Sequence, residues 1–189
     1  MKNFLRLTTD VDVLPLLLAI TRRPALWRED TYLRDYPQGP FGEVESILLR
    51  FPPRSVHATE AALAAHNNTV DQHENVDYPV YGLLPEARVL VMALMARVGG
   101  ERLGRCMINK IGAGGRIFPH ADTPAHADYW DRFHIVLASN DRAPFRCGEE
   151  TVHMATGEVW WFQNAIEHEV INHGSSDRIH LIVDIRTSH

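Results

Sequence analysis

A histidine and an aspartate, separated by one residue, follow a stretch with strand character. The segment "IFPHAD" (117–122) places His120 and Asp122 just before a proline turn. Alternate residues of an extended chain point to the same side, so both side chains could reach one metal ion. With a second imidazole they would form the facial triad that holds Fe(II) and keeps positions open. Because an H-x-D spacing often arises by chance, two polar residues in a surface loop are the alternative.

The C-terminal half offers four candidates for the missing imidazole. His168 is favoured, because it opens "HEVIN" directly after "GEVWWFQNAIE" and so follows a turn between two predicted strands. The other candidates are His153, His173 and His180.

Arg178 begins the last predicted strand, "RIHLIVDIR". Alternation places Arg178, His180, Ile182 and Asp184 on one face, and the apolar residues between them are expected to pack against helices. An inward arginine is costly unless it meets an anion. A dicarboxylic co-substrate would supply that anion, and a salt bridge to Asp177 or Asp184 is the alternative.

A second strand, "DRFHIVLASN" (131–140), repeats this combination. Arg132 and His134 share one of its faces, which suggests another anion contact. The alternative is a strand end whose polar groups are solvated.

The first half of the chain is predicted to be helix-rich. Helices are expected at 11–23, 58–68 and 81–100, a strand at 43–51, and a polar loop at 67–79. The apolar stripe of 81–100 is nearly continuous, which predicts burial on a wide face, and Gly99-Gly100 ends this helix.

After Gly100, short β-branched or aromatic segments alternate with turn residues, which is typical of a sandwich or barrel. We therefore expect one domain over 1–189, with a helix-rich part at 1–100 and a closed all-β core at 101–189.

Bulk composition excludes several classes of protein. The net charge is -5 and no basic run is present, so nucleic acid is not an expected partner. No apolar run approaches the roughly 20 residues of a membrane span, and no signal peptide is expected, because the first ten residues lack its long apolar core. A cytoplasmic location is expected, with Cys106 and Cys147 as buried thiols. The oligomeric state stays open.

The stretch from Met107 to Arg186 resembles the aspartyl/asparaginyl β-hydroxylase branch of the Fe(II)- and 2-oxoglutarate-dependent oxygenases. The resemblance rests on the order and spacing of "GGRIFPHAD", "RFHIVLASN", "GEVWWFQNAIEHEVIN" and "DRIHLIVDIR". It implies a mostly β protein with N-terminal helices, folded as a double-stranded β-helix, the cupin-like jelly roll.

The resemblance also implies roles for single residues. His120, Asp122 and His168 match the iron ligands, and Arg178 matches the residue that holds the distal carboxylate of 2-oxoglutarate. Three more residues match positions near the co-substrate. His134 corresponds to a contact of the carboxylate next to the ketone, Arg132 to a position near co-substrate or substrate, and Asn109 to a small hydroxyl residue that assists the distal carboxylate.

The activity implied is hydroxylation of an unactivated C–H bond with Fe(II), 2-oxoglutarate and O2, and with ascorbate as an optional reductant. The substrate would be an amino acid or an Asp or Asn residue of a peptide. Segments 27–42 and 67–79 are candidate substrate walls, with Arg28 and Arg34 facing a carboxylate or simply solvated. A cupin-type isomerase or lyase and a catalytically silent binding module are the alternatives.

Overall fold

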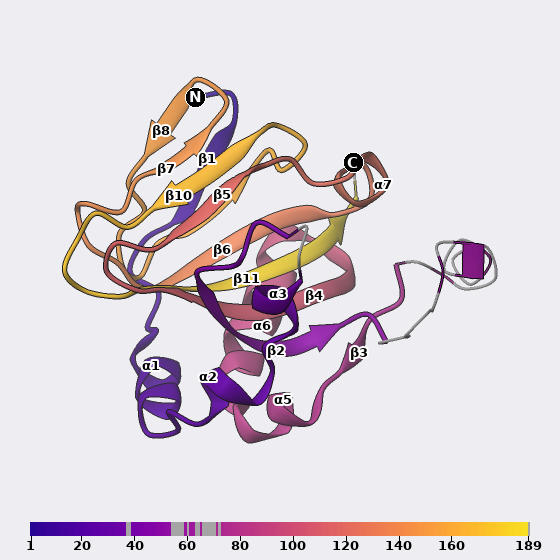
Figure 1. Cartoon of the computed structure of the whole chain (residues 1–189), viewed down its shortest axis with the longest axis horizontal. Helices are drawn as coiled ribbons and strands as arrows, with labels where there is room; N and C mark the ends of the chain where they lie inside the picture. The colour runs from indigo at the N-terminus through magenta and orange to yellow at the C-terminus, as the bar shows by residue number, and fades with distance from the viewer. Residues whose placement is uncertain are drawn as a thin grey trace.

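Two antiparallel sheets form the body of the molecule, and helices cover one of them (Figure 1). The computed structural model describes residues 1–36, 39–53, 59, 61, 62, 65, 71 and 73–188. The strands are β1 (Phe4–Thr8), β2 (Val44–Phe51), β3 (Val76–Asp77), β4 (Gly100–Ile111), β5 (Arg116–His120), β6 (Asp131–Ala138), β7 (Phe145–Cys147), β8 (Glu150–Val152), β9 (Val159–Phe162), β10 (His168–Ile171) and β11 (Arg178–Thr187). The helices are α1 (Leu14–Thr21), α2 (Leu26–Glu29), α3 (Tyr32–Asp35), α5 (Pro79–Leu83), α6 (Pro85–Val98) and α7 (Pro124–Ala127).

The larger sheet has seven strands in the order β1-β9-β6-β11-β4-β2-β3, and the smaller has four in the order β5-β10-β7-β8. From β4 to β11 the chain passes from one sheet to the other at every step except the β7–β8 hairpin, which confirms the predicted jelly roll. The N-terminal part contributes more than was expected, because β1 pairs with β9 and β2 pairs with β4.

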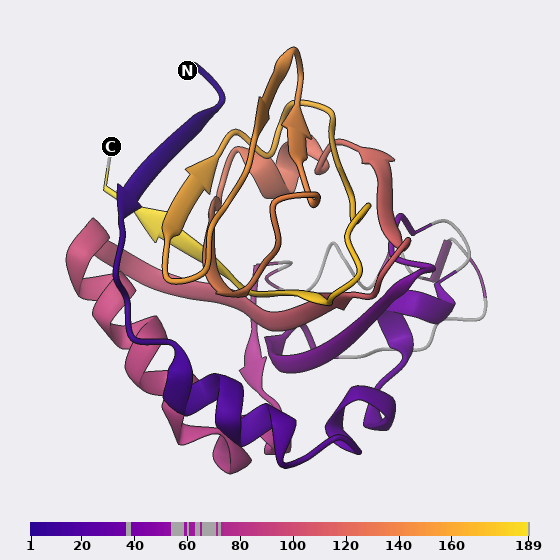
Figure 2. The ribbon, with the colours of Figure 1, turned by 90° about the vertical axis from the view of Figure 1, so that its left-hand side faces the viewer.

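The outer face of the larger sheet carries the helices (Figure 2). As predicted, the odd-numbered residues Ile179, Leu181, Val183 and Ile185 of β11 belong to the apolar core beneath α1 and α6. The structure corrects the wide buried face expected for 81–100. Helix α6 buries only a narrow stripe, Ala87, Val91 and Leu94, while Val89 and Met92 are exposed.

The inner face of the larger sheet packs on the smaller sheet. A second apolar core lies between the two and fills one part of the interior: Phe4, Val44, Ile111, Ile117, Val136, Phe145, Cys147, Met154, Trp160, Phe162 and Val170. A third apolar group, called here the inner apolar cluster, consists of Leu48, Phe51, Met107 and Ile182, with Leu33 and Tyr78 against it. Polar side chains of the site lie among these two groups.

Most predicted elements are confirmed. Helix α1 falls within 11–23, β2 within 43–51, and 81–100 contains most of α5, all of α6 and the left-handed Gly99 that ends α6. Strand β1 was not predicted, strand β3 lies in the segment expected to be a loop, and most of the helix expected at 58–68 lies outside the described residues.

Two further observations concern the chain as a whole. Both Cys106 and Cys147 are free, buried thiols, as expected. Within the described part of the chain, no helix has the length and apolar character needed to cross a bilayer.

Candidate metal centre

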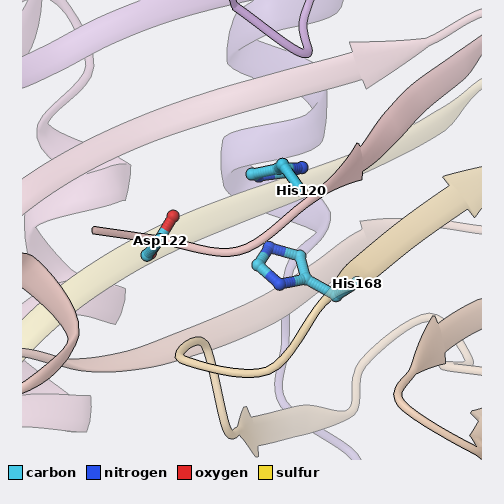
Figure 3. Close-up of side chains that lie close together, drawn as sticks. All are labelled: His120, Asp122 and His168. Carbon is cyan, nitrogen blue, oxygen red and sulfur yellow. The ribbon is translucent and has the colours of Figure 1, made fainter. Parts of the chain in front are cut away.

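His120, Asp122 and His168 come together at one edge of the smaller sheet (Figure 3). His120 ends β5, Asp122 follows it in the next loop, and His168 begins β10. The two histidines are direct cross-strand partners, with ring centroids 4.2 Å apart. One potential ligand atom from each of the three residues lies within 4.8 Å of the other two. The structure therefore unites the three residues that the sequence had singled out for a metal.

Each imidazole is oriented by the backbone. Nδ1 of His120 lies 2.8 Å from the carbonyl oxygen of Phe118, and Nδ1 of His168 lies 2.8 Å from that of Ile166. A carbonyl oxygen only accepts, so Nδ1 carries the proton in both rings and Nε2 carries a lone pair. Metal-binding histidines commonly donate their other N–H to such an acceptor.

The carboxylate of Asp122 is held through one oxygen. Its Oδ2 accepts hydrogen bonds from Nη1 of Arg132 at 2.7 Å and Nδ2 of Asn164 at 2.9 Å. The backbone N–H of Asp122 donates to the carbonyl oxygen of Asn164 at 3.0 Å. Because both side-chain contacts use Oδ2, Oδ1 is the oxygen that they leave able to bind a cation.

Arg132 links Asp122 to strand β11. Its Nε lies 2.7 Å from Oδ1 of Asp184 and its Nη2 lies 3.0 Å from Oδ2 of the same residue. Oδ2 of Asp184 also lies 2.9 Å from Nε2 of His126, on α7. Both Arg132 and His134 are buried, so the alternative of a solvated strand end is wrong. A direct contact of Arg132 with co-substrate or substrate stays a prediction, since each of its three nitrogens already bonds a protein group.

Electrostatics favour the protonation states that a metal requires. Burial lowers the pKa of His120. Burial, together with the charge of the neighbouring His120, lowers the pKa of His168 to about 4. Burial alone would raise the pKa of Asp122, but the charge of Arg132 outweighs it and holds the pKa below its usual value. At neutral pH the site therefore presents two neutral imidazoles and one carboxylate, which are the ligand forms that bind metal.

Arg178 is fully buried near this site. The ring of Phe145 lies 5.7 Å from its Cζ and 6.0 Å from the ring of His168, so the same aromatic side chain contacts both the guanidinium and one residue of the triad. None of the ion pairs between described residues involves Arg178, and Asp184 bonds Arg132 instead. The salt bridge to Asp184 considered from the sequence is therefore wrong. Burial lowers the pKa of Arg178 to about 9.

Three buried hydrogen-bond donors, one of Arg178 and two of its neighbours, lack a protein partner within the described residues. These atoms are Nη1 of Arg178, Nε2 of His180 and Nδ2 of Asn109. Asn109 and His180 are cross-strand partners on β4 and β11, and Oδ1 of Asn109 accepts from the hydroxyl of Ser46 at 2.9 Å. Unpaired buried donors are rare, so three together indicate an acceptor-rich ligand such as a carboxylate.

His134 completes this polar row. Its Nδ1 lies 3.2 Å from Nδ1 of His180, which also lies 3.2 Å from Nη2 of Arg178. Because a guanidinium only donates, Nδ1 of His180 is the acceptor of both contacts, and Nδ1 of His134 carries a proton. The predicted contact of His134 with the co-substrate stays a prediction.

Comparison with known proteins places the chain in a family. Residues 71–188, more than half of the chain, match the family model described as aspartyl/asparaginyl beta-hydroxylase. The chain belongs to the aspartyl/asparaginyl beta-hydroxylase family. The matched segment of this β-hydroxylase family member contains all three residues of the triad and Arg178.

The β-hydroxylase family member also resembles individual proteins. An L-proline cis-4-hydroxylase of Rhizobium meliloti (strain 1021) is 25% identical over 81 residues, 43% of this chain but only 29% of the relative's length. A prolyl-4-hydroxylase of Pseudomonas putida superposes with a TM-score of 0.50 and 13% identity, over 100% of this chain and 95% of that one. The nickel complex of a non-heme monooxygenase, ThoJ, superposes with a TM-score of 0.55 and 10% identity, over 98% of this chain and 74% of that one. At such identities the two structures bear on the fold alone, and they agree with the predicted double-stranded β-helix.

The site contains residues that the sequence did not reveal. Asn164, His126 and Ser46 each bond a site residue from a distant segment, and no motif marks them. The candidate wall residues Arg28 and Arg34 are exposed, on α2 and α3, and Nε of Arg34 lies 3.4 Å from Oδ1 of its neighbour Asp35.

Proposed function

We propose that the protein is an Fe(II)- and 2-oxoglutarate-dependent hydroxylase. The observation that carries this proposal is the convergence of His120, Asp122 and His168, with both imidazoles oriented through Nδ1 and the aspartate through Oδ2. Two nitrogens and one oxygen with positions open beside them are the donor set of non-heme iron oxygenases. Membership of the β-hydroxylase family supports the same reaction class.

In this proposal Nε2 of His120, Oδ1 of Asp122 and Nε2 of His168 hold the iron. Arg132 and Asn164 keep Asp122 ionised and oriented, and the carbonyl groups of Phe118 and Ile166 fix the two imidazoles. The residues present therefore fit the metal without any change of tautomer or charge. When bound, the iron would supply dioxygen activation, conversion of 2-oxoglutarate to succinate, and insertion of oxygen into a C–H bond.

The distal carboxylate of 2-oxoglutarate would bind Arg178. Its orphan Nη1, together with Nδ2 of Asn109 and Nε2 of His180, offers donors to both carboxylate oxygens. Burial of these donors selects for a diacid, because a co-substrate without the second carboxylate would leave them unpaired. His134, whose Nδ1 lies 3.2 Å from Nδ1 of His180, is proposed to orient the keto-acid end.

The substrate is proposed to be an amino acid or an Asp or Asn residue of a peptide. The L-proline cis-4-hydroxylase relative and the name of the family support this class together. The inner apolar cluster would form the wall that excludes water from the reacting carbon.

Two other functions, a cupin-type isomerase or lyase and a silent binding module, make different predictions. Neither consumes 2-oxoglutarate, and neither accounts for three unpaired buried donors around Arg178. The partner affinity of a silent module would survive loss of His168.

A succinate assay tests the proposal. Protein loaded anaerobically with Fe(II), then given 2-oxoglutarate and oxygen, should release succinate slowly without any prime substrate. His168→Ala should abolish this release, whereas His153→Ala, an exposed histidine outside the triad, should not. Folded, iron-loaded wild-type protein that yields no succinate would overturn the proposal.

A further inference from the structure

Arg105 lies in a β-bulge close to the candidate metal centre. The ladder between β4 and β11 shifts register here, so that Gly104 and Arg105 together oppose Asp184. The ladder between β4 and β2 shifts register beside it, next to Arg50. Bulges re-aim side chains and are frequent next to active sites. Gly104 allows this close approach, because a Cβ there would lie 2.9 Å from the ring of Trp130 and 3.0 Å from Cβ of Asp184.

The bulge directs the Arg105 side chain toward the inner apolar cluster. Its Cζ lies 5.0 Å from the centroid of the Phe51 ring, which belongs to that cluster with Met107 and Ile182. Met107 is two residues from Asn109 on β4, and Ile182 is two residues from His180 on β11, so each pair shares a face. The guanidinium of Arg105 therefore faces the same space between the two sheets as the three unpaired donors. It lies closer than they do to the end of that space where Asp184 and Asp122 are found.

Among the described residues, Arg105 has no anionic hydrogen-bonding partner. It takes part in no hydrogen bond or ion pair between described residues, although it is close enough to Asp184 and Asp122 for their charges to act on its pKa. Both carboxylates already bond Arg132. Burial lowers the pKa of Arg105, so its charge is poorly solvated. A poorly solvated guanidinium without an anion is costly unless a ligand supplies one.

We propose that Arg105 binds a carboxylate of the prime substrate and places the adjoining carbon chain along Met107, Ile182 and Leu48, toward His120 and His168. This inference rests on the proposed function. The carboxylate has two sources, the main-chain carboxylate of a free amino acid or the side-chain carboxylate of an acidic residue in a peptide. In either case Arg105 decides specificity, whereas Arg178 serves the co-substrate.

The test measures succinate release by iron-loaded wild type, Arg105→Gln, Arg105→Lys and Arg22→Gln. The probes are the free amino acids, their C-terminal amides, and capped peptides with a central Asp or Asn. Arg22 is the control because it is an exposed arginine at the end of α1, outside the candidate substrate walls. Calorimetric titration of the oxygen-free proteins with the stimulating probe measures its affinity independently of turnover.

We expect every probe that stimulates succinate release to carry a carboxylate. The corresponding amide should require a concentration about 10- to 100-fold higher for the same stimulation, because it loses a charged hydrogen bond. Arg105→Gln should weaken binding of that probe by the same factor in both assays, and should leave co-substrate affinity unchanged. Arg105→Lys should restore part of the affinity, and Arg22→Gln should match wild type. Stimulation by a free acid but by no capped peptide identifies the main-chain carboxylate, and stimulation by the capped Asp peptide but not the Asn peptide identifies the side chain.

The inference is overturned if amides match acids, if no probe stimulates, or if Arg105→Gln keeps the wild-type affinity for the probe in both assays. Absence of substrate-free succinate release from wild type would instead overturn the proposed function, so the two failures are distinguishable.

Discussion

Nη1 of Arg132 lies 2.7 Å from Oδ2 of Asp122, and Nε of the same guanidinium lies 2.7 Å from Oδ1 of Asp184. One buried arginine thus joins the proposed iron ligand to the central strand β11. Because the arginine occupies Oδ2, it fixes which oxygen of Asp122 can face a metal. Asp184 in turn keeps the guanidinium in place, so it acts on the site through Arg132.

Replacing Arg132 should therefore harm both stability and metal binding. Arg132→Met leaves the buried carboxylate of Asp184 and the partly buried carboxylate of Asp122 without their cation, and we expect a loss of about 3–5 kcal/mol in the free energy of unfolding. Loss of an orienting group should also weaken Fe(II) binding by about 10- to 100-fold. Urea unfolding and anaerobic metal titration measure the two effects.

Arg6→Met is the matched control for this change. Arg6 forms a similarly short ion pair with Glu158, at 2.8 Å, but the Arg6 side chain is 53% exposed. Glu158 would keep its hydrogen bonds from Trp160 and Ala155, so the loss of Arg6 should cost less than about 1 kcal/mol. Equal costs for the two variants would contradict the view that Arg132 is a central buried link.

The three proposed ligands should be separable from other histidines by metal content. His120→Ala, Asp122→Ala and His168→Ala should each retain little iron after anaerobic loading and desalting, because two remaining ligands bind weakly. His153→Ala and His173→Ala remove exposed histidines outside the triad and should retain the wild-type amount. Iron analysis of the five variants tests this assignment of the ligands. Full retention of iron by His168→Ala would show that His168 is not a ligand.

Replacing Arg178 should affect stability and co-substrate binding in opposite directions. Its guanidinium is buried with an unpaired Nη1 and no carboxylate partner among the described residues. Replacing it by Met should leave the metal-free protein equally stable or more stable, by up to about 4 kcal/mol. The same change should weaken co-substrate binding by at least about 100-fold, since two charged hydrogen bonds are lost.

Urea unfolding of the metal-free protein and calorimetry with 2-oxoglutarate check this pair of effects. A variant that is strongly destabilised yet binds 2-oxoglutarate normally would show that Arg178 has a structural role only. Ile179→Ala, on the opposite face of β11, should show the reverse pattern, with lower stability and normal binding.

Stability should depend on pH through the buried histidines. Burial lowers the pKa of His120, His134, His168 and His180, and that of His168 reaches about 4, against about 6.5 in the unfolded chain. Between pH 6.5 and 4 the unfolded chain therefore binds more protons, so the free energy of unfolding must fall as the pH falls. For His168 alone the shift corresponds to about 3 kcal/mol.

The carboxylates act in a different pH range. Asp122 and Asp184 have lowered pKa values, so their contribution is complete above about pH 4 and is lost only below it. Urea unfolding of metal-free protein at pH 7, 6 and 5 measures the histidine contribution. A free energy of unfolding that stays constant or rises toward pH 5 would show that the histidines are not buried as described.

Local sequence predicted much of the site. Alternation alone placed Arg178, His180, Ile182 and Asp184 on one face of β11, and the register with β4 and β6 bears this out. The position of His168 after a turn was enough to select it over the other histidines. These features depend on residues a few positions apart, which is the range that strand periodicity covers.

Contacts between distant segments could not be predicted in this way. Periodicity gives the face of a residue but not its partner, so Asp184 was considered for Arg178 although it bonds Arg132. Arg105 escaped notice because a bulge interrupts the alternation of β4, and bulges leave little trace in sequence.

Apolar composition was misleading in two places. Helix α6 is apolar almost all round, but packing on the sheet buries only one stripe of it. Strand β1 was missed for the opposite reason, since Phe4 is its single buried residue and gives no alternating pattern. In both cases the neighbouring sheet, not the segment itself, sets how much of it is buried.

The most direct test of the central claim is the location of the metal. Crystals grown anaerobically with Fe(II) and 2-oxoglutarate, measured at the iron absorption edge, should give one strong anomalous peak within about 2.0–2.3 Å of Nε2 of His120, Oδ1 of Asp122 and Nε2 of His168, with the far end of the diacid against Arg178. A peak elsewhere in the molecule, or iron-loaded crystals without a peak between these three atoms, would contradict the account.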